Sequence, residues 1–446
     1  MGNDSTTAFR TREQLRRFLG IFSPRFSKPK PGFLGQMLFG IQAARDTLVS
    51  EIARSLQEGV LAKKTQERLE HHLQADGLDD KIHGSLLCDA ASSIHEDTLI
   101  IIDPTDVQKP YAEKMPYLAK VWDGSKGKVG DNLGYTLCMA IACENGCRRI
   151  VPPMLRLWSS VHPEYASEND EVCQVVGQIA SATNRRGIFV CDRGGDGDNM
   201  FKFYIDHGYD FIVRLAGDRN LLNWGGKTKD SMVLAEALAR QCTLRYEDSV
   251  LYKSHNTVHD IRIKYGSMPV RLPVRPEAEL RLVVVKWPKG EKPMMLLTTL
   301  DAVRTRKALW EVVQGYITRW RVEETIRYIK QSYRLGHMRL LDCQRLKNKH
   351  GGSRRCGFVS RGCMARQEGE ARGAREPCRE GLAKDVRGVR VLLLRDRRRP
   401  ALALRLPRQM ARPRLRPGEA RRPADGVRAS VRMMACDPSR QQRQNR

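Results

Sequence analysis

Two short apolar runs, each leading into an aspartate, place the strongest constraint on the fold of this chain. Residues 98–102 (Thr-Leu-Ile-Ile-Ile) precede Asp103, and residues 187–191 (Gly-Ile-Phe-Val-Cys) precede Asp192. Short, bounded apolar runs of this kind predict buried strands. Pro104 is expected to stop the pairing of the first strand, because proline has no N–H to donate. The sequence therefore predicts one strand that ends at Asp103 and a later strand that places Asp192 at the carboxyl edge of a sheet.

The segments between and after these runs predict a mixed α/β sheet. Residues 109–134 are polar and predict turns. The other predicted elements are strands Tyr135–Cys143 and Arg149–Leu157, helix Asn169–Thr183, a helix near Met200–His207 and strand Asp210–Leu215. The two strands before the first helix form a hairpin around Asn145-Gly146, a dipeptide typical of tight turns. Asp196 and Asp198 are alternatives to Asp192 as the acid that follows the second apolar run. Their Gly-rich surroundings favour turn positions instead.

The second half of the chain predicts a β-rich stretch and then a helix. The predicted strands are Leu244–Lys253, His259–Tyr265, Glu279–Lys286 and Pro293–Thr299. A helix is predicted over Thr305–Tyr333, where good helix formers dominate.

One face of that helix carries a carboxylate within a row of cations. Tyr316, Arg319, Glu323 and Lys330 fall on one side at about 100° per residue, and Arg327 joins them. Val322, Ile326, Ile329 and Tyr333 form an adjoining apolar stripe that would pack on a core. By periodicity alone the polar face could equally be a solvated surface with helix salt bridges, Glu323 pairing with Arg319 or Arg327.

The spacing Tyr-x2-Arg-x3-Glu-x6-Lys over Tyr316–Lys330 resembles the signature of the DDE transposases of bacterial insertion sequences. The resemblance implies an α/β fold with an RNase H-like mixed sheet and a β-rich insertion. It implies that Asp103, Asp192 and Glu323 are catalytic and bind two Mg²⁺ or Mn²⁺ ions. It also implies that Tyr316, Arg319 and Lys330 grip DNA-end phosphates, and the neighbouring Arg327 is placed with them.

The same resemblance implies a reaction and its partners. The enzyme would nick the terminal inverted repeats of an insertion element and transfer the freed 3′-hydroxyl into target DNA, so both partners are double-stranded DNA. A homodimer is expected when the C-terminus is intact. Two alternatives stay open: an inactive remnant or repressor that only binds the element ends, and an RNase H-type nuclease that cuts without strand transfer.

Residues 1–96 predict a mostly helical region. Gln36–Leu56 is periodic over its length and predicts a long helix, and a turn at Glu58-Gly59 leads to the basic helix Lys63–Leu73. Thr65, Arg68, His71 and His72 stand out on that last helix. The arrangement fits either a helix-turn-helix that contacts DNA or a plain packing domain. The expected domains are 1–96, 97–216 (first part of the core), 217–303 (insertion), 304–349 (catalytic helix) and 350–446 (disordered basic tail).

The tail differs in composition from the rest of the chain. The formal net charge is +27, and residues 351–446 hold 25 Arg, one Lys and nine acidic residues. Such a tail could be disordered and bind DNA nonspecifically. We favour a frameshift, because Arg/Gly/Pro-rich text is typical of a GC-rich gene read in the wrong frame. For one choice of codons, reading residues 350–357 one base later gives an apolar stretch.

The net charge, the cysteine spacing and the hydropathy of the chain limit the classes of protein to which it can belong. The basic balance favours a polyanionic partner such as nucleic acid. The twelve cysteines show no paired CxxC spacing, which indicates reduced thiols rather than a zinc site. No apolar run reaches the ~18 residues of a membrane span, and the N-terminus is too polar for a signal peptide. We therefore expect a bacterial cytoplasmic protein associated with the nucleoid and with no membrane contact.

Overall fold

The computed structural model describes most of the first 338 residues. The described residues are 13–22, 24–26, 29–109, 112–123, 128–145, 150–223, 225–240, 244–254, 257–288, 292–300 and 305–338. Contacts divide the chain into two units, Met1–Val391 and Leu392–Arg446, and every described residue lies in the first. The predictions of a disordered tail and of a frameshift therefore fall outside the described residues.

Residues 13–20 are helical, and four further helices lie between them and the first strand. They are α2 (Pro29–Ala44), α3 (Val49–Leu56), α4 (Ala62–Leu73) and α5 (Leu78–Ala91). The prediction of one long helix over Gln36–Leu56 is wrong. Arg45 takes a left-handed φ of 52°, and the Asp46 carboxylate accepts a hydrogen bond from the Leu48 N–H at 3.0 Å. The backbone therefore leaves the helical conformation between α2 and α3, at a break that periodicity does not reveal.

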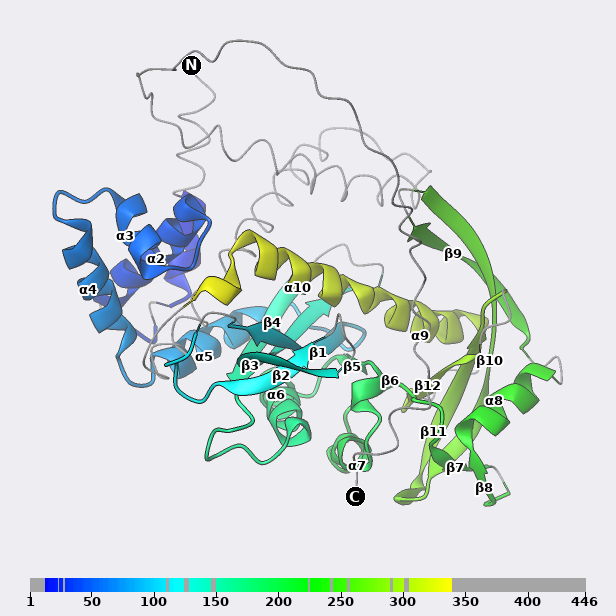
Figure 1. The fold of residues 1–446 in the computed structure, drawn as a ribbon. Helices are drawn as coiled ribbons and strands as arrows, with labels where there is room; N and C mark the ends of the chain where they lie inside the picture. The colour runs from blue at the N-terminus through cyan, green and yellow to red at the C-terminus, as the bar shows by residue number, and fades with distance from the viewer. Residues whose placement is uncertain are drawn as a thin grey trace, which may run out of the picture. The chain divides into compact units, whose positions relative to one another are not determined.

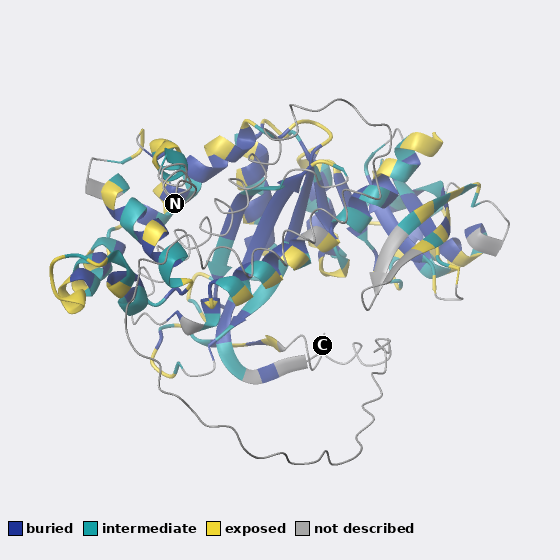
Figure 2. Ribbon diagram, turned by 90° about the horizontal axis from the view of Figure 1, so that it is seen from above, coloured by how far each residue is buried: buried dark blue, intermediate teal, exposed yellow. Residues whose placement is uncertain are grey.

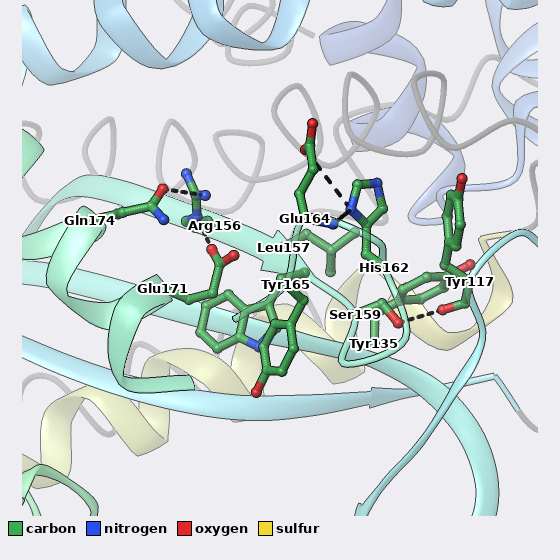
Figure 3. A pocket seen from close by; sticks show the side chains of 11 residues that line it. Tyr117, Tyr135, Arg156, Leu157, Ser159, His162, Glu164, Tyr165, Glu171 and Gln174 are labelled. Atoms are coloured by element: carbon green, nitrogen blue, oxygen red, sulfur yellow. Dashed lines mark hydrogen bonds and ion pairs between the residues drawn. The ribbon is translucent and has the colours of Figure 1, made fainter. Parts of the chain in front are cut away.

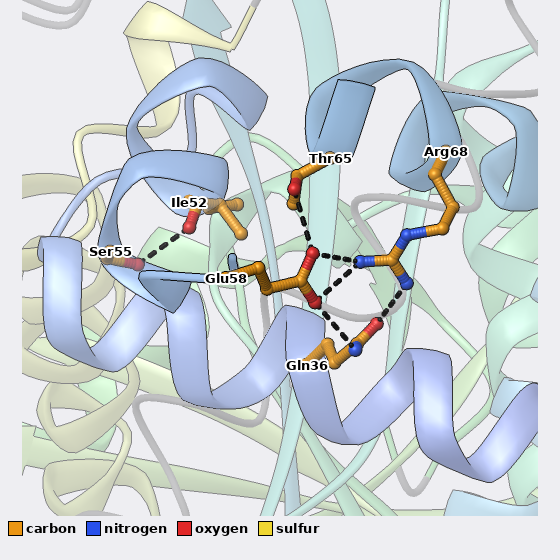
Figure 4. Close-up of polar contacts among 6 residues, drawn as sticks. All are labelled: Gln36, Ile52, Ser55, Glu58, Thr65 and Arg68. Carbon is orange, nitrogen blue, oxygen red and sulfur yellow. Dashed lines mark hydrogen bonds and ion pairs between the residues drawn. The ribbon is translucent and has the colours of Figure 1, made fainter. Parts of the chain in front are cut away.

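A polar network holds α2, α4 and the turn after α3 together (Figure 4). The Glu58 carboxylate accepts hydrogen bonds from both Thr65 and Arg68, and Arg68 also donates to Gln36. Arg68 and Thr65 are therefore engaged within the helical region, although the sequence singles them out as candidates for DNA contact. On α4, Lys63, Lys64 and His71 remain exposed.

The central sheet is mixed, as the sequence predicts. Its first strands are β1 (Leu99–Gln108), β2 (Ala119–Asp123), β3 (Lys128–Cys143), β4 (Ile150–Trp158), β5 (Ile188–Cys191) and β6 (Phe211–Arg214). β3 pairs antiparallel with both β1 and β4, and β5 lies parallel between β1 and β6. The α/β class with a mixed sheet is confirmed. β2 and the first half of β3 lie where the sequence predicted only turns.

Pro104 does not end β1. The strand continues to Gln108, and Pro104 lies opposite Cys138 of β3. The physical reason is that β5 pairs with β1 only at Leu99–Ile101, so one edge of β1 is already free when the chain reaches Pro104. A residue without an N–H is tolerated at such an open edge.

The β-rich stretch extends the same sheet. Its elements are β7 (Asn220–Leu222), β8 (Thr228–Asp230), α8 (Ser231–Arg240), β9 (Tyr246–Ser254), β10 (Thr257–Leu272), β11 (Arg275–Lys286) and β12 (Met294–Thr298). β12 pairs antiparallel with β6, and β11 and β10 follow outward from it. The four predicted strands are present as β9 to β12, whereas α8 and the short strands β7 and β8 were not predicted.

Helices cover both faces of the sheet (Figure 1). On one face lie α9 (Arg306–Thr318) and α10 (Trp320–Ser332), and on the other lie α6 (Glu168–Ala182) and α7 (Asp198–Asp206). Alternate residues of β1 divide between the two layers, Leu99 and Ile101 packing with α9 and α10. Gly315 lets α9 approach closely, since a Cβ there would lie 3.2 Å from Leu99. The central strands between these layers are almost entirely buried (Figure 2).

The predicted helix over Thr305–Tyr333 is divided at Arg319. The Arg319 N–H donates to the Tyr316 carbonyl at 3.0 Å, and the Val322 N–H donates to the Arg319 carbonyl at 3.0 Å. These three-residue bonds tighten one turn between α9 and α10. Arg319 itself keeps helical angles (φ −51°, ψ −32°), so the helical character of the segment is preserved. Among the described residues, no helix is both long and apolar enough to cross a bilayer.

Candidate active site

Asp103 and Asp192 lie at the same level of two neighbouring strands. β1 and β5 pair in parallel with Ile101 opposite Val190, and each aspartate follows two residues later. Because side chains alternate along a strand, each aspartate faces the same side as the residue two before it. Ile101 and Val190 both pack in the core layer under α9 and α10. Both aspartates therefore face these helices.

Glu323 comes to the same place from the first turn of α10. The buried residues Val322, Ile326 and Ile329 seat this helix on the sheet, where it contacts β1 and β3. The Glu323 carboxylate is half-buried and accepts a hydrogen bond from the Arg319 guanidinium at 2.7 Å. This is one of the pairs that the solvated-face interpretation predicted, but Arg319 is only 6% exposed.

The pKa of Asp103 shows that the three acids share one environment. It is raised to about 7 from an ordinary value of 3.8. Burial is the largest cause, and the negative charges of Asp192 and Glu323 raise the pKa further. Arg319 and Lys330 oppose the shift but do not cancel it. At Asp103, burial and the two neighbouring acids together outweigh the two cations.

Lys330 joins the far end of α10 to the same strand. Its ammonium donates a hydrogen bond to the Thr105 hydroxyl at 2.9 Å and lies 3.7 Å from the Asp106 carboxylate. Burial lowers the pKa of Lys330, and the charges of Asp106 and Asp103 act in the opposite direction. Lys330 is therefore close enough to Asp103 and Asp106 for their charges to act on it.

Tyr316 and Arg319 are buried together beneath the helices. The guanidinium carbon of Arg319 lies 5.7 Å from the centre of the Tyr316 ring. Within the described part of the chain, the Tyr316 hydroxyl and the Arg319 Nε have no hydrogen-bond partner. Burial tends to lower the pKa of Arg319, but the charges of Tyr316 and the three acids raise it overall. Arg327, by contrast, has an exposed side chain.

The acids approach each other without forming a closed metal site. Among the described residues, no three His, Cys, Asp or Glu side chains lie close enough together to hold one ion. Two of the three candidate ligands have protein partners, since Glu323 is bonded to Arg319 and Asp192 accepts from the Gly194 N–H at 2.8 Å. The donors are nevertheless carboxylate oxygens, the type that hard divalent cations prefer. The uncompensated charge around Asp103 fits a cation, provided that Glu323 releases Arg319.

Two features near the acids were missed by sequence reasoning. Glu168, the first residue of α6, has a pKa raised by burial and by the charge of Asp192, although its side chain is exposed. Its place beside Asp192 depends on the fold, so no local signal could have revealed it. Arg219 pairs with Asp196, in the loop after Asp192, and with Asp198, the first residue of α7. Asp196 therefore lies in a loop, whereas the prediction of a turn position for Asp198 is wrong.

A separate cavity of about 180 Å³ lies along β4 (Figure 3). Arg156 at its side is held by Glu171 and Gln174 of α6. The rings of Tyr117 and His162 meet edge-on, with their centres 4.6 Å apart, at another side. None of the residues predicted to be catalytic or DNA-binding lines this cavity.

Comparison with known proteins places the chain in a family. The family described as "Transposase DDE domain" matches residues 94–349, which is more than half of the chain. No curated protein matches the sequence significantly. One similar solved structure is a cryo-EM structure of a piggyBac transposase synaptic complex with hairpin DNA. It is 12% identical, covers 83% of this chain and 72% of that chain, and gives a TM-score of 0.43, too low to support an inference. On the family match, the chain belongs to the transposase DDE domain family.

Proposed function

We propose that this protein is a DNA transposase that nicks the ends of an insertion element and transfers the freed 3′-hydroxyl to target DNA. The observation that supports the proposal is the environment of Asp103, whose pKa is raised by burial and further by the charges of Asp192 and Glu323, two acids that come from a second strand and a later helix. The family match over residues 94–349 supports the same reading. The strand order β4-β3-β1-β5-β6, with β5 and β6 parallel to β1, supports an RNase H-like core.

In this proposal Asp103, Asp192 and Glu323 hold two divalent ions, Mg²⁺ or Mn²⁺. Asp103 is the central acid of this set, because the charges of both other acids act on it. Bound ions would lower the pKa of the attacking water or 3′-hydroxyl and stabilise the leaving oxygen. The protein supplies the rest: a rigid sheet under two of the carboxylates, and a helix that carries the third.

The cations of α10 differ in their proposed roles because they differ in exposure. Arg327 is exposed and can contact a DNA phosphate directly. Arg319 and Lys330 lie beside the acids, where their charges would attract the phosphate that is to be cut. Tyr316 is buried under Arg319, so its contact with DNA would require Arg319 to move.

The proposed domain division follows the expected one. Residues 1–96 would bind element ends, 97–216 and 304–349 would form the catalytic core, and 217–303 would be the β-rich insertion that extends the sheet. Residues 350–446 would be the product of a frameshift that replaces a native dimer-forming segment. The nucleotide sequence tests this last point: an alternative frame with early stop codons and no apolar periodicity past codon 350 would contradict it.

The test of function is Mn²⁺-dependent cleavage of the DNA ends that flank this gene. The parent protein is expected to nick them, and Glu323→Gln is expected to bind the same DNA without nicking it. Glu324→Gln, an exposed neighbour on the same helix, is the matched control and should nick normally. A parent protein that binds the ends but never nicks them would instead support the binding-only alternative.

A second assay separates a transposase from a simple nuclease. Pre-cut ends with a free 3′-hydroxyl are mixed with a supercoiled target plasmid. A transposase is expected to join them to the target in a reaction that requires Asp103. Cleavage without any joining would point to the nuclease alternative.

A further inference from the structure

Lys109 is a buried lysine that the proposed chemistry does not use. It follows the last residue of β1 and is 2% exposed. Its ammonium donates hydrogen bonds to two backbone carbonyls, that of Leu335 at 2.6 Å and that of Met338 at 3.1 Å. Burial lowers its pKa to about 7. In the described part of the chain no carboxylate forms an ion pair with Lys109. Its ammonium group instead donates its hydrogen bonds to these two carbonyl groups.

The segment that Lys109 holds is the continuation of α10. α10 ends at Ser332, Arg334 takes a left-handed φ of 46°, and the short helix η2 (Leu335–His337) follows. Leu335 and Met338 are buried in the same core layer as α9 and α10. Gly336 passes so close to β1 that a Cβ there would lie 3.3 Å from the Gln108 carbonyl oxygen. The segment is therefore packed against the end of β1.

The N-terminal helices hold the same segment from another side. The Thr47 hydroxyl donates to the Arg334 carbonyl at 3.3 Å, and the Arg334 guanidinium lies 3.5 Å from the Asp46 carboxylate. Asp46 also accepts from the Leu48 N–H at the start of α3. Residues 334–338 thus join the helical region, β1 and α10 at one point.

β1 and α10 are connected at three successive levels. The charges of Asp103 and Glu323 interact at the first level, Lys330 bonds to Thr105 at the second, and Lys109 holds Leu335 and Met338 at the third. Asp103, Thr105, Val107 and Lys109 are alternate residues, so they share the face of β1 toward α10. The third level is the most buried of the three, and it is where α10 is attached to β1.

We propose that Lys109 is a positioning residue that fixes α10, and with it Glu323, against the strand that carries Asp103. This inference rests on the proposed function, because positioning matters only if the two acids act together. A methionine side chain, which is one atom shorter and has no amine, would fill most of the space but lose both hydrogen bonds. α10 would then keep its apolar packing, the Lys330 contact and the contacts of Arg334 with the N-terminal helices, but it would lose its two hydrogen bonds to the end of β1. A displacement of even 1 Å is costly for metal-ion geometry.

The test compares Lys109→Met with the parent by two readouts. The first is Mn²⁺ binding, measured as the metal concentration that gives half of the maximal rise in melting temperature. The second is the single-turnover nicking rate at saturating DNA. Lys109→Met is expected to raise the half-saturating Mn²⁺ concentration about tenfold and to slow nicking by a similar factor. Its affinity for end DNA should change less than twofold, since Lys109 is too buried to touch DNA. Lys114→Met, at an exposed lysine nearby, is the matched control.

The outcomes separate the two proposals. If the parent shows no Mn²⁺-dependent rise in melting temperature that Asp103→Asn abolishes, the proposed function fails. If the parent does, and Lys109→Met binds Mn²⁺ as tightly as the parent, only the inference about Lys109 fails. If Lys109→Met does not fold, Mn²⁺ binding by Gly336→Ala tests the inference instead. The added Cβ pushes the same segment from β1 by a few tenths of an ångström. About threefold weaker Mn²⁺ binding by Gly336→Ala supports the inference, and unchanged binding overturns it.

Discussion

The ammonium of Lys330 donates a hydrogen bond to the hydroxyl of Thr105 at 2.9 Å, which ties the end of α10 to β1 two residues beyond Asp103. The two residues are far apart in sequence, and only the packing of α10 on the sheet brings them together. The same contact leaves the Lys330 charge close enough to act on Asp103. One side chain therefore both stabilises the helix position and supplies charge to the acids.

Thr105→Val is predicted to weaken this link without changing the volume of the side chain. Loss of a hydrogen bond to a partly exposed ammonium should lower the free energy of unfolding by about 1 kcal/mol. The nicking rate should fall as well, because Lys330 is then held only by Asp106 at 3.7 Å. Urea denaturation and the end-nicking assay measure the two effects. Thr105→Ser keeps the hydroxyl and should behave like the parent, so equal losses in both variants would refute the role of this bond.

Asp103→Asn is predicted to stabilise the metal-free protein in a pH-dependent way. The folded state raises the pKa of Asp103 to about 7 from 3.8, so it binds this proton more tightly than the unfolded state does. The resulting stability is present below pH 4 and is lost as the pH rises through about 7. Asn does not titrate. The free energy of unfolding of the variant, relative to that of the parent, should therefore rise by on the order of 3 kcal/mol between pH 5 and pH 8.

Denaturation in EDTA at the two pH values measures this gain. Addition of Mn²⁺ at pH 8 should make the parent more stable than Asp103→Asn, since the metal stabilises only the parent. A difference in stability between the two proteins that is the same at pH 5 and pH 8 would mean that Asp103 is not in a crowded acidic site.

The elements that carry the acids could be predicted from the sequence because their signals are local. The apolar runs before Asp103 and Asp192 mark β1 and β5, and the spacing from Tyr316 to Lys330 marks the later helix. The remaining features depend on partners that are distant in sequence. Pro104 is accommodated because β5 ends early, β12 joins β6 to extend the sheet, and Lys109 is buried because residues 335–338 return to β1. No window of sequence contains these contacts.

Arg219→Met is predicted to destabilise the loop that follows Asp192. The Arg219 guanidinium pairs with Asp196 and Asp198, donates to the Asp196 carbonyl at 3.0 Å and lies 4.9 Å from the Phe201 ring centre. Since the Asp196 side chain is almost fully buried, removal of its partner should cost about 3 kcal/mol. Urea denaturation measures the loss. The double variant Arg219→Met/Asp196→Asn should recover part of it, and no recovery would show that the buried charge is not the cause.

The exposed lysines of α4 offer the last prediction, which concerns how the helical region would bind DNA. Lys63 and Lys64 lie in the first turn of α4, and the Glu58–Arg68 pair holds that helix in place. Replacing both lysines with alanine should leave the melting temperature unchanged, because neither is buried. If α4 contacts phosphates, the salt dependence of end binding should become shallower by about 2 in log–log slope, one for each lost contact. Glu58→Gln is the complementary variant: it should destabilise the helical region by about 1 kcal/mol and weaken DNA binding only through that loss. An unchanged salt slope in the double-lysine variant would instead favour the alternative in which these helices serve packing alone.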